Sequence, residues 1–139
     1  MYNVFIDSDI ILDFLSERKP FFKDAKQILT YASLKKIKLH TSAIIYANVF
    51  YVLRKEFSPA MVKSRLIDLS EMIQIVNTTH DSTKNALHSD FSDFENAIQY
   101  YTALENKCAF LITRNLKDFG KAKNIRVLTS AQFCKLFVK

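Results

Sequence analysis

Short apolar runs alternate with longer amphipathic segments along almost the whole chain. The apolar runs are rich in β-branched and aromatic residues, and they predict strands over residues 4–6, 38–41, 73–78, 109–113 and 125–128. The segments between them have apolar residues at helical spacing, and they predict helices over residues 9–15, 21–34, 43–57, 58–72, 79–88, 92–105 and 130–137. Because strands alternate with helices, we expect an α/β fold with a mostly parallel sheet of four or five strands and helices on both faces.

Polar residues that can cap a helix mark several of the predicted helix starts. Ser42 precedes the helix over residues 43–57, and Ser92 with Glu95 forms a capping-box pattern at the start of a later helix. The helix over residues 43–57 is apolar on nearly all sides, which predicts that it is largely buried. Asn48 is then a polar residue inside a buried helix and needs a partner.

The first strand ends abruptly in carboxylates. Asp7 stands directly on the apolar end of the strand, where an ionised side chain loses its water unless a cation or hydrogen-bond donors lie nearby. Asp9 either joins Asp7 at a divalent cation or caps the first helix. Asp13 is expected on the exposed side of that helix, in solvent. Ligands of open parallel sheets bind at the carboxyl ends of the strands, so the first two acids indicate a site there.

Further polar residues reach the same edge if the strands over 4–6 and 109–113 are neighbours. The residues expected to gather beside Asp7 and Asp9 are Thr113, Arg114 and Asn115 at the end of the later strand, with Asp118 one turn further on, Asp93 and Asn96 on one helix face, and Asn48 from another helix. Such oxygen ligands bind Mg²⁺ or Mn²⁺, which can activate a water and stabilise the charge on a phosphodiester being cleaved. Taken alone, Asp93 is more simply explained as an acid that complements a helix N-terminus.

Composition narrows the choice of chemistry. The 139 residues, which we interpret as one domain over 1–139, include a single glycine, Gly120, so the chain has neither a P-loop nor a dinucleotide-binding fingerprint. The net charge of +6 and the pI of about 9.3 fit a polyanionic partner such as nucleic acid, and equally a basic solvated surface. No apolar run approaches the length of about 20 residues that spans a bilayer, and no leader is evident, so we expect a cytoplasmic protein without a membrane partner.

Cysteine and histidine give no sign of a metal site. Cys108 and Cys134 are far apart in apolar settings, so we expect two buried, unpaired side chains. His40, His80 and His88 lack the spacing of metal ligands, and we expect all three at the surface or in loops.

Four stretches of the sequence carry a family resemblance. They are residues 4–13 (VFIDSDIILD), 41–48 (TSAIIYAN), 93–100 (DFENAIQY) and 111–119 (LITRNLKDF). In this order they resemble the four successive motifs of the PIN domain family, which includes ribonuclease toxins of the VapC type. The resemblance covers essentially the whole chain. It implies a three-layer α/β/α sandwich and a Mg²⁺- or Mn²⁺-dependent ribonuclease, often the toxin of a toxin-antitoxin pair.

The resemblance also implies which residues form the site. The four acidic positions of the family fall on Asp7, Asn48, Asn96 and Asn115, so three of the four are amides here. An amide oxygen can bind a cation but brings no charge. The sequence resembles a branch of the family with Ala-Asn in the second motif and Thr-Arg-Asn-x-x-Asp-Phe in the fourth, where Asp93 and Asp118 would supply the missing charge.

The expected function is therefore a metal-dependent endoribonuclease. Asp7 would be the principal ligand, assisted by Asp93 and Asp118, with Asp9 behind them. The three amides would orient water or the metal ion. The expected RNA contacts are Arg114, Lys117, Arg54 and Lys55.

Two alternatives and two partners stay open at this point. The protein could be a PIN-fold RNA- or protein-binding module with a degenerate metal site. Asp-x-Asp after a strand also marks haloacid-dehalogenase-type phosphohydrolases, but these need a later Gly-Asp pair, and Gly120 is followed by Lys121. An antitoxin protein and a second copy of the chain are the expected protein partners, the latter because Tyr46, Phe50 and Tyr51 add more aromatic surface than a small core requires.

Overall fold

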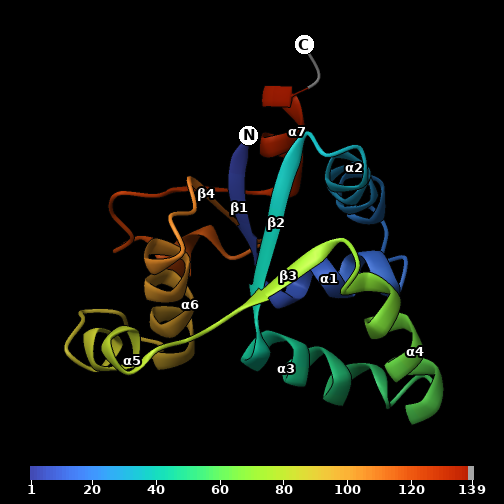
Figure 1. Cartoon of the computed structure of the whole chain (residues 1–139), viewed down its shortest axis with the longest axis horizontal. Helices are drawn as coiled ribbons and strands as arrows, with labels where there is room; N and C mark the ends of the chain where they lie inside the picture. The colour runs from blue at the N-terminus through green and yellow to red at the C-terminus, as the bar shows by residue number, and fades with distance from the viewer. Residues whose placement is uncertain (138–139) are drawn as a thin grey trace.

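The computed structural model describes residues 1–137 and is built around a five-stranded sheet. All neighbouring strands are parallel, in the order β3-β2-β1-β4-β5 (Figure 1). The strands are β1 (Tyr2–Ile6), β2 (Ile37–Ser42), β3 (Ile73–Val76), β4 (Phe110–Ile112) and β5 (Arg126–Leu128). The predicted α/β class is confirmed, and β1 and β4 are direct neighbours, as the site hypothesis requires.

Helices cover both faces of the sheet and make it the middle of three layers (Figure 1). The helices are α1 (Ser8–Leu15), α2 (Phe22–Ser33), α3 (Ala43–Leu53), α4 (Pro59–Leu69), α5 (His80–Leu87), α6 (Phe94–Glu105) and α7 (Ser130–Phe137), with a 3-10 helix η1 (Leu116–Phe119) after β4. On one face α5 packs on α6, and on the other α2 contacts α1 and α7. Among residues 1–137, no helix is both long and apolar enough to cross a membrane.

The central strand β1 lies at the heart of the core. Val4, Phe5 and Ile6 are at most 1% exposed because helices cover both sides of the strand. Cys108 and Cys134 are free and buried, as predicted. Burial raises the pKa of the Cys108 thiol to about 12, so it is an unreactive part of the core.

Helix α3 differs from the prediction in length and in burial. It ends at Leu53 instead of residue 57, and its buried residues are only Ile45, Val49 and Leu53. The Tyr51 side chain is 54% exposed. The helix packs mainly against α1 and α4, and these contacts leave part of its apolar surface uncovered, so its apolar composition does not translate into burial all round.

Histidine burial was also predicted wrongly in one case. His80 and His88 are exposed, but His40 is 6% exposed in β2, between its partners Phe5 on β1 and Gln74 on β3. Burial lowers the pKa of His40, with help from the charge of Lys38, and keeps the ring neutral.

Candidate active site

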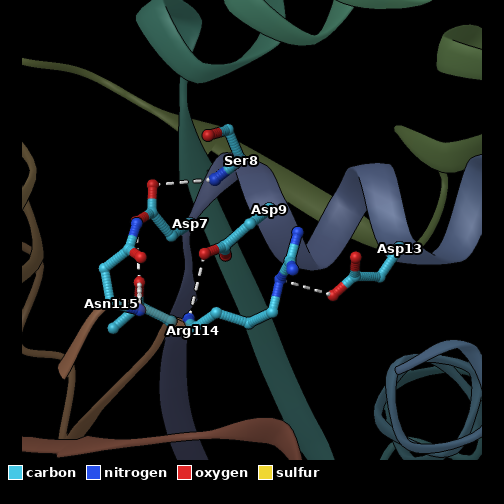
Figure 2. A network of polar contacts seen from close by, with 7 residues as sticks. Asp7, Ser8, Asp9, Asp13, Arg114 and Asn115 are labelled. Carbon is cyan, nitrogen blue, oxygen red and sulfur yellow. Dashed lines mark hydrogen bonds and ion pairs between the residues drawn. The ribbon is translucent and has the colours of Figure 1, made fainter. Parts of the chain in front are cut away.

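Asp7 connects the sheet to the first helix. Its backbone N–H continues the parallel pairing by donating to the Ile112 carbonyl oxygen at 3.0 Å, and its side chain then N-caps α1. One carboxylate oxygen accepts from the Ser8 backbone N–H at 2.8 Å (Figure 2). The other accepts from the Thr113 hydroxyl at 2.9 Å. The carboxylate is therefore held in one orientation at the carboxyl ends of β1 and β4.

The fold disfavours the charged form of this carboxylate. Asp7 is only 7% exposed, and burial is the largest cause that raises its pKa to about 6. The nearby charges of Asp9 and Asp93 raise it further, whereas the hydrogen bonds from Ser8 and Thr113 lower it. A cation beside Asp7 would relieve both the burial and the repulsion.

Asp9 lies in the first turn of α1, two residues after Asp7, and faces the loop after β4. Its Oδ2 accepts from the Arg114 backbone N–H at 2.9 Å (Figure 2). Its Oδ1 is buried and has no hydrogen-bond partner within the described part of the chain. Burial is the main cause that raises the pKa of Asp9. The prediction that Asp9 caps the first helix is wrong, because Asp7 is the N-cap.

Asp13 was predicted in solvent and is instead fully buried. Arg114 makes this burial tolerable: its Nε lies 3.2 Å from Asp13 Oδ2, and its guanidinium carbon lies 4.3 Å from the centre of the Phe21 ring. Arg114 therefore ties the loop after β4 to α1, through its backbone to Asp9 and through its side chain to Asp13 (Figure 2). The Arg114 side chain remains 31% exposed.

Asp93 begins α6 on the neighbouring side of the site. It is the N-cap, and its carboxylate accepts from the Asn96 backbone N–H at 2.9 Å. The prediction that Ser92 is the cap is therefore off by one residue. Because the charge of Asp93 raises the pKa of Asp7, Asp93 faces the same site from a different element.

The other predicted amides border the site rather than fill it. Asn48 is half-buried on α3, and its Nδ2 donates to the Glu95 carboxylate on α6. Asn115 is exposed, and its backbone N–H donates to the Thr113 hydroxyl at 3.1 Å, which in turn holds Asp7. The predicted cluster therefore centres on Asp7 and Asp9, with Asp93 near enough for its charge to act on Asp7 and with Asn48 and Asn115 at the border.

The remaining predicted residues lie farther out. Asp118 and Lys117 are exposed on η1, and Asp118 is not among the charges that shift the pKa of Asp7. Arg54 and Lys55 are exposed at the end of α3, where the Arg54 guanidinium stacks 4.7 Å from the Tyr51 ring centre. Within residues 1–137, no three side chains of His, Cys, Asp or Glu are grouped as a ready-made metal site.

Thr113 was expected beside Asp7 and Asp9, and the structure places it there: it is fully buried and is the hydrogen-bond donor that orients Asp7. The contact of the Arg114 guanidinium with the Phe21 ring was not predicted. The sequence gives no signal for it, because the contact spans most of the chain.

A parallel sheet in this order, with buried aspartates at its carboxyl edge, defines an α/β/α sandwich protein with an acidic site. Residues 3–117 match the family described as the PIN domain. The chain belongs to the PIN domain family.

Individual relatives agree with this assignment. The chain is 30% identical over 140 residues to "Ribonuclease VapC1" of Aquifex aeolicus (strain VF5), a match that covers 95% of this chain and 93% of the relative. Its fold is similar to a toxin-antitoxin complex chain from Klebsiella pneumoniae (TM-score 0.68, 24% identity, 91% of this chain and 97% of that chain). It is also similar to VapC20 of Mycobacterium tuberculosis, described as a Sarcin-Ricin loop cleaving toxin (TM-score 0.64, 16% identity, 88% and 98%).

Proposed function

We propose that this protein is an endoribonuclease that uses Mg²⁺ or Mn²⁺ to cleave RNA phosphodiesters at the edge formed by β1 and β4. The observation that carries the proposal is Asp7, a nearly buried carboxylate with a pKa of about 6 that Ser8 and Thr113 hold at the end of β1. The names of two relatives, a ribonuclease and a Sarcin-Ricin loop cleaving toxin, support RNA as the substrate.

The chemistry of the donors fits a hard divalent cation. The side-chain atoms of Asp7, Asp9 and Asp93 that could bind an ion are all carboxylate oxygens. The buried Asp9 Oδ1 has no hydrogen-bond partner within residues 1–137. Mg²⁺ commonly binds through one or two carboxylates and keeps several waters, so three clustered acids are not required. When bound, the ion would polarise a phosphoryl oxygen and lower the pKa of a water. In this proposal Asp7 is the principal ligand, and Asp9 and Asp93 contribute the further negative charge.

The amides and cations have supporting roles in this proposal. Asn48, Asn96 and Asn115 would orient water or the ion without adding charge. Lys117 is exposed on η1, just after Arg114 and Asn115, and would contact a phosphate of the RNA farther from Asp7. Asp118 contributes only if η1 moves toward Asp7.

Two protein partners belong to the same proposal. The toxin-antitoxin complex among the fold neighbours supports an antitoxin as a protein partner. The exposed apolar side chains of Tyr51 and Val52 on α3 and of Met61 on α4 support pairing with a second copy.

A specific observation favours a second candidate function, a binding module without catalysis. Amides occupy positions 48, 96 and 115, and no ready-made group of three acids is present among residues 1–137. Such a protein would still bind RNA through its basic surface but would not cut it.

Incubation of a mixed RNA pool with the full chain tests the proposal. We expect cleavage with Mn²⁺, loss of cleavage with chelator, and at least about 100-fold slower cleavage by Asp7→Asn, because a principal ligand would lose its charge. Asp68→Asn, an exposed change on α4, is the matched control and should cleave like the wild type. Cleavage that is insensitive to chelator would refute the metal mechanism, and RNA binding without cleavage would favour the binding module.

A further inference from the structure

A hollow of about 410 Å³ opens beside the acidic site, between α2, the loop after β4 and the start of α7. Its lining residues are Phe21, Asp24, Arg114, Asn115, Thr129, Ser130 and Ala131. Arg114 and Asn115 line the hollow and also contact the acidic site. The Arg114 backbone N–H donates to Asp9, and the Asn115 backbone N–H donates to the Thr113 hydroxyl that orients Asp7. The acidic site and the hollow therefore share the loop residues Arg114 and Asn115.

We propose that this hollow is a nucleobase subsite, which holds a base next to the scissile phosphodiester and favours guanine. The inference rests on the proposed ribonuclease function and names a determinant of its substrate. The lining suits a flat, neutral, hydrogen-bonding group. The Phe21 ring and the Arg114 guanidinium provide the kind of planar surfaces on which bases stack, and the volume lies in the range of small-ligand pockets.

Charge argues for a base and against a phosphate. Arg114 is the only cation of the seven lining residues, and its charge already faces the buried Asp13 at 3.2 Å. Asp24 adds a carboxylate to the same lining. Because no surplus positive charge remains among the lining residues, an anion gains little there.

The polar groups of the lining can read the edge of a base. Ser130 is one of the lining residues, but it is only 6% exposed and its hydroxyl oxygen is enclosed, without a hydrogen-bond partner in the described chain, so the Asp24 carboxylate is the group that can meet the edge of a base. The Asp24 carboxylate accepts hydrogen bonds and cannot donate them. Guanine has two adjacent N–H donors on its Watson–Crick edge, whereas the other bases have one N–H or amino group there. A carboxylate with two oxygens therefore favours guanine.

Nucleosides titrated into the full chain, with chelator present, test the subsite without reference to catalysis. Backbone NMR resonances of Ser130 and Ala131 should shift with guanosine, and guanosine should bind more tightly than uridine. Asp24→Asn should weaken guanosine binding by about tenfold, because the carboxylate loses its charge and one of its two acceptor oxygens becomes an NH2 donor. Asp68→Asn, an exposed control on α4, should not change it. Ala131→Phe should fill the hollow and abolish the binding of every nucleoside.

Sequencing of the cut ends separates this inference from the proposed function. If the wild type prefers guanosine beside the cut, Asp24→Asn loses that preference and the exposed control Asp68→Asn keeps it, the subsite is supported. If guanosine binds as expected but no RNA is cut, the subsite is supported and the ribonuclease function fails. If RNA is cut and Asp24→Asn leaves the preference unchanged, or guanosine shifts no resonance near Ser130, the subsite is refuted.

Discussion

At the scale of single residues, Asp7 shows a conflict between stability and function. Its pKa is raised from 3.8 to about 6 because the fold buries the carboxylate beside other acids. An acid that is easier to protonate in the folded state than in the unfolded state stabilises the fold at low pH, and this contribution is lost as the pH rises through the folded-state pKa. At neutral pH the fold therefore carries a costly charge, which is expected where a cation is meant to bind.

The first prediction follows from the sign of this shift. A difference of about two pKa units corresponds to about 3 kcal/mol, which is an upper bound for the buried Asp7. With chelator present, the free energy of unfolding of Asp7→Asn relative to wild type should rise by up to about 3 kcal/mol between pH 4 and pH 7.5. Urea denaturation at both pH values measures it. A difference that does not change with pH would contradict the assigned pKa.

The second prediction concerns Arg114 and Asp13. Arg114→Ala leaves Asp13 as a buried charge without a partner, and we expect it to lower the free energy of unfolding by about 2–3 kcal/mol. The double variant Asp13→Asn with Arg114→Ala should recover most of that loss, since the unpaired charge is gone. Lys117→Ala, an exposed change on the same loop, should stay within about 0.5 kcal/mol of wild type. Additive effects of the Asp13 and Arg114 changes in urea denaturation would show that the pair is not coupled.

At the scale of elements, the start of α6 combines two tasks in one side chain. Asp93 caps the helix through the Asn96 backbone N–H, and its charge also acts on Asp7. These tasks can be separated because serine is as good an N-cap as aspartate but has no charge.

The third prediction uses this difference. Asp93→Ser should keep the stability of the wild type and weaken Mn²⁺ binding, whereas Asp93→Ala should weaken Mn²⁺ binding and also lose about 1 kcal/mol of stability. Thermal unfolding with and without Mn²⁺ measures both effects. If Asp93→Ser binds Mn²⁺ as tightly as wild type, Asp93 is only a helix cap.

The same elements show what the sequence could and could not predict. The strands, their alternation with helices and the cap at Ser42 follow from local patterns, and the structure confirms them. The burial of Asp13 did not follow, because its partner Arg114 is about a hundred residues away in the sequence. The exposure of α3 did not follow either, because composition does not tell which side of a helix meets a neighbour.

At the scale of the whole molecule, sheet order creates the site. Because β1 lies between β2 and β4, the acid after β1 meets the loop after β4, and α3 and α6 enter from the β2 side. The convergence of Asp7 with Asn115 was therefore predictable once β1 and β4 were assumed to be neighbours. How much each acid contributes to the site was not predictable from the sequence. Asp118, for example, lies on the 3-10 helix η1, which the sequence pattern did not predict.

The fourth prediction uses the net charge of +6. RNA binding with chelator present should weaken as salt rises, and removing one phosphate contact should reduce the salt slope by about 0.7. The double variant Arg54→Ala with Lys55→Ala should reduce the slope by about 1.4 in fluorescence anisotropy. Lys35→Ala with Lys36→Ala, a change before β2 at the other end of the sheet, should leave the slope unchanged. If both double variants have the same salt slope, the RNA does not contact Arg54 and Lys55.

The central claim is that Asp7 holds a divalent cation, and calorimetric titration of Mn²⁺ into wild type and Asp7→Asn tests it most directly. We predict saturable heat in the wild type that approaches one ion per chain and is lost in Asp7→Asn, because the ion loses its principal carboxylate. Identical, negligible heats in the two proteins would contradict the account.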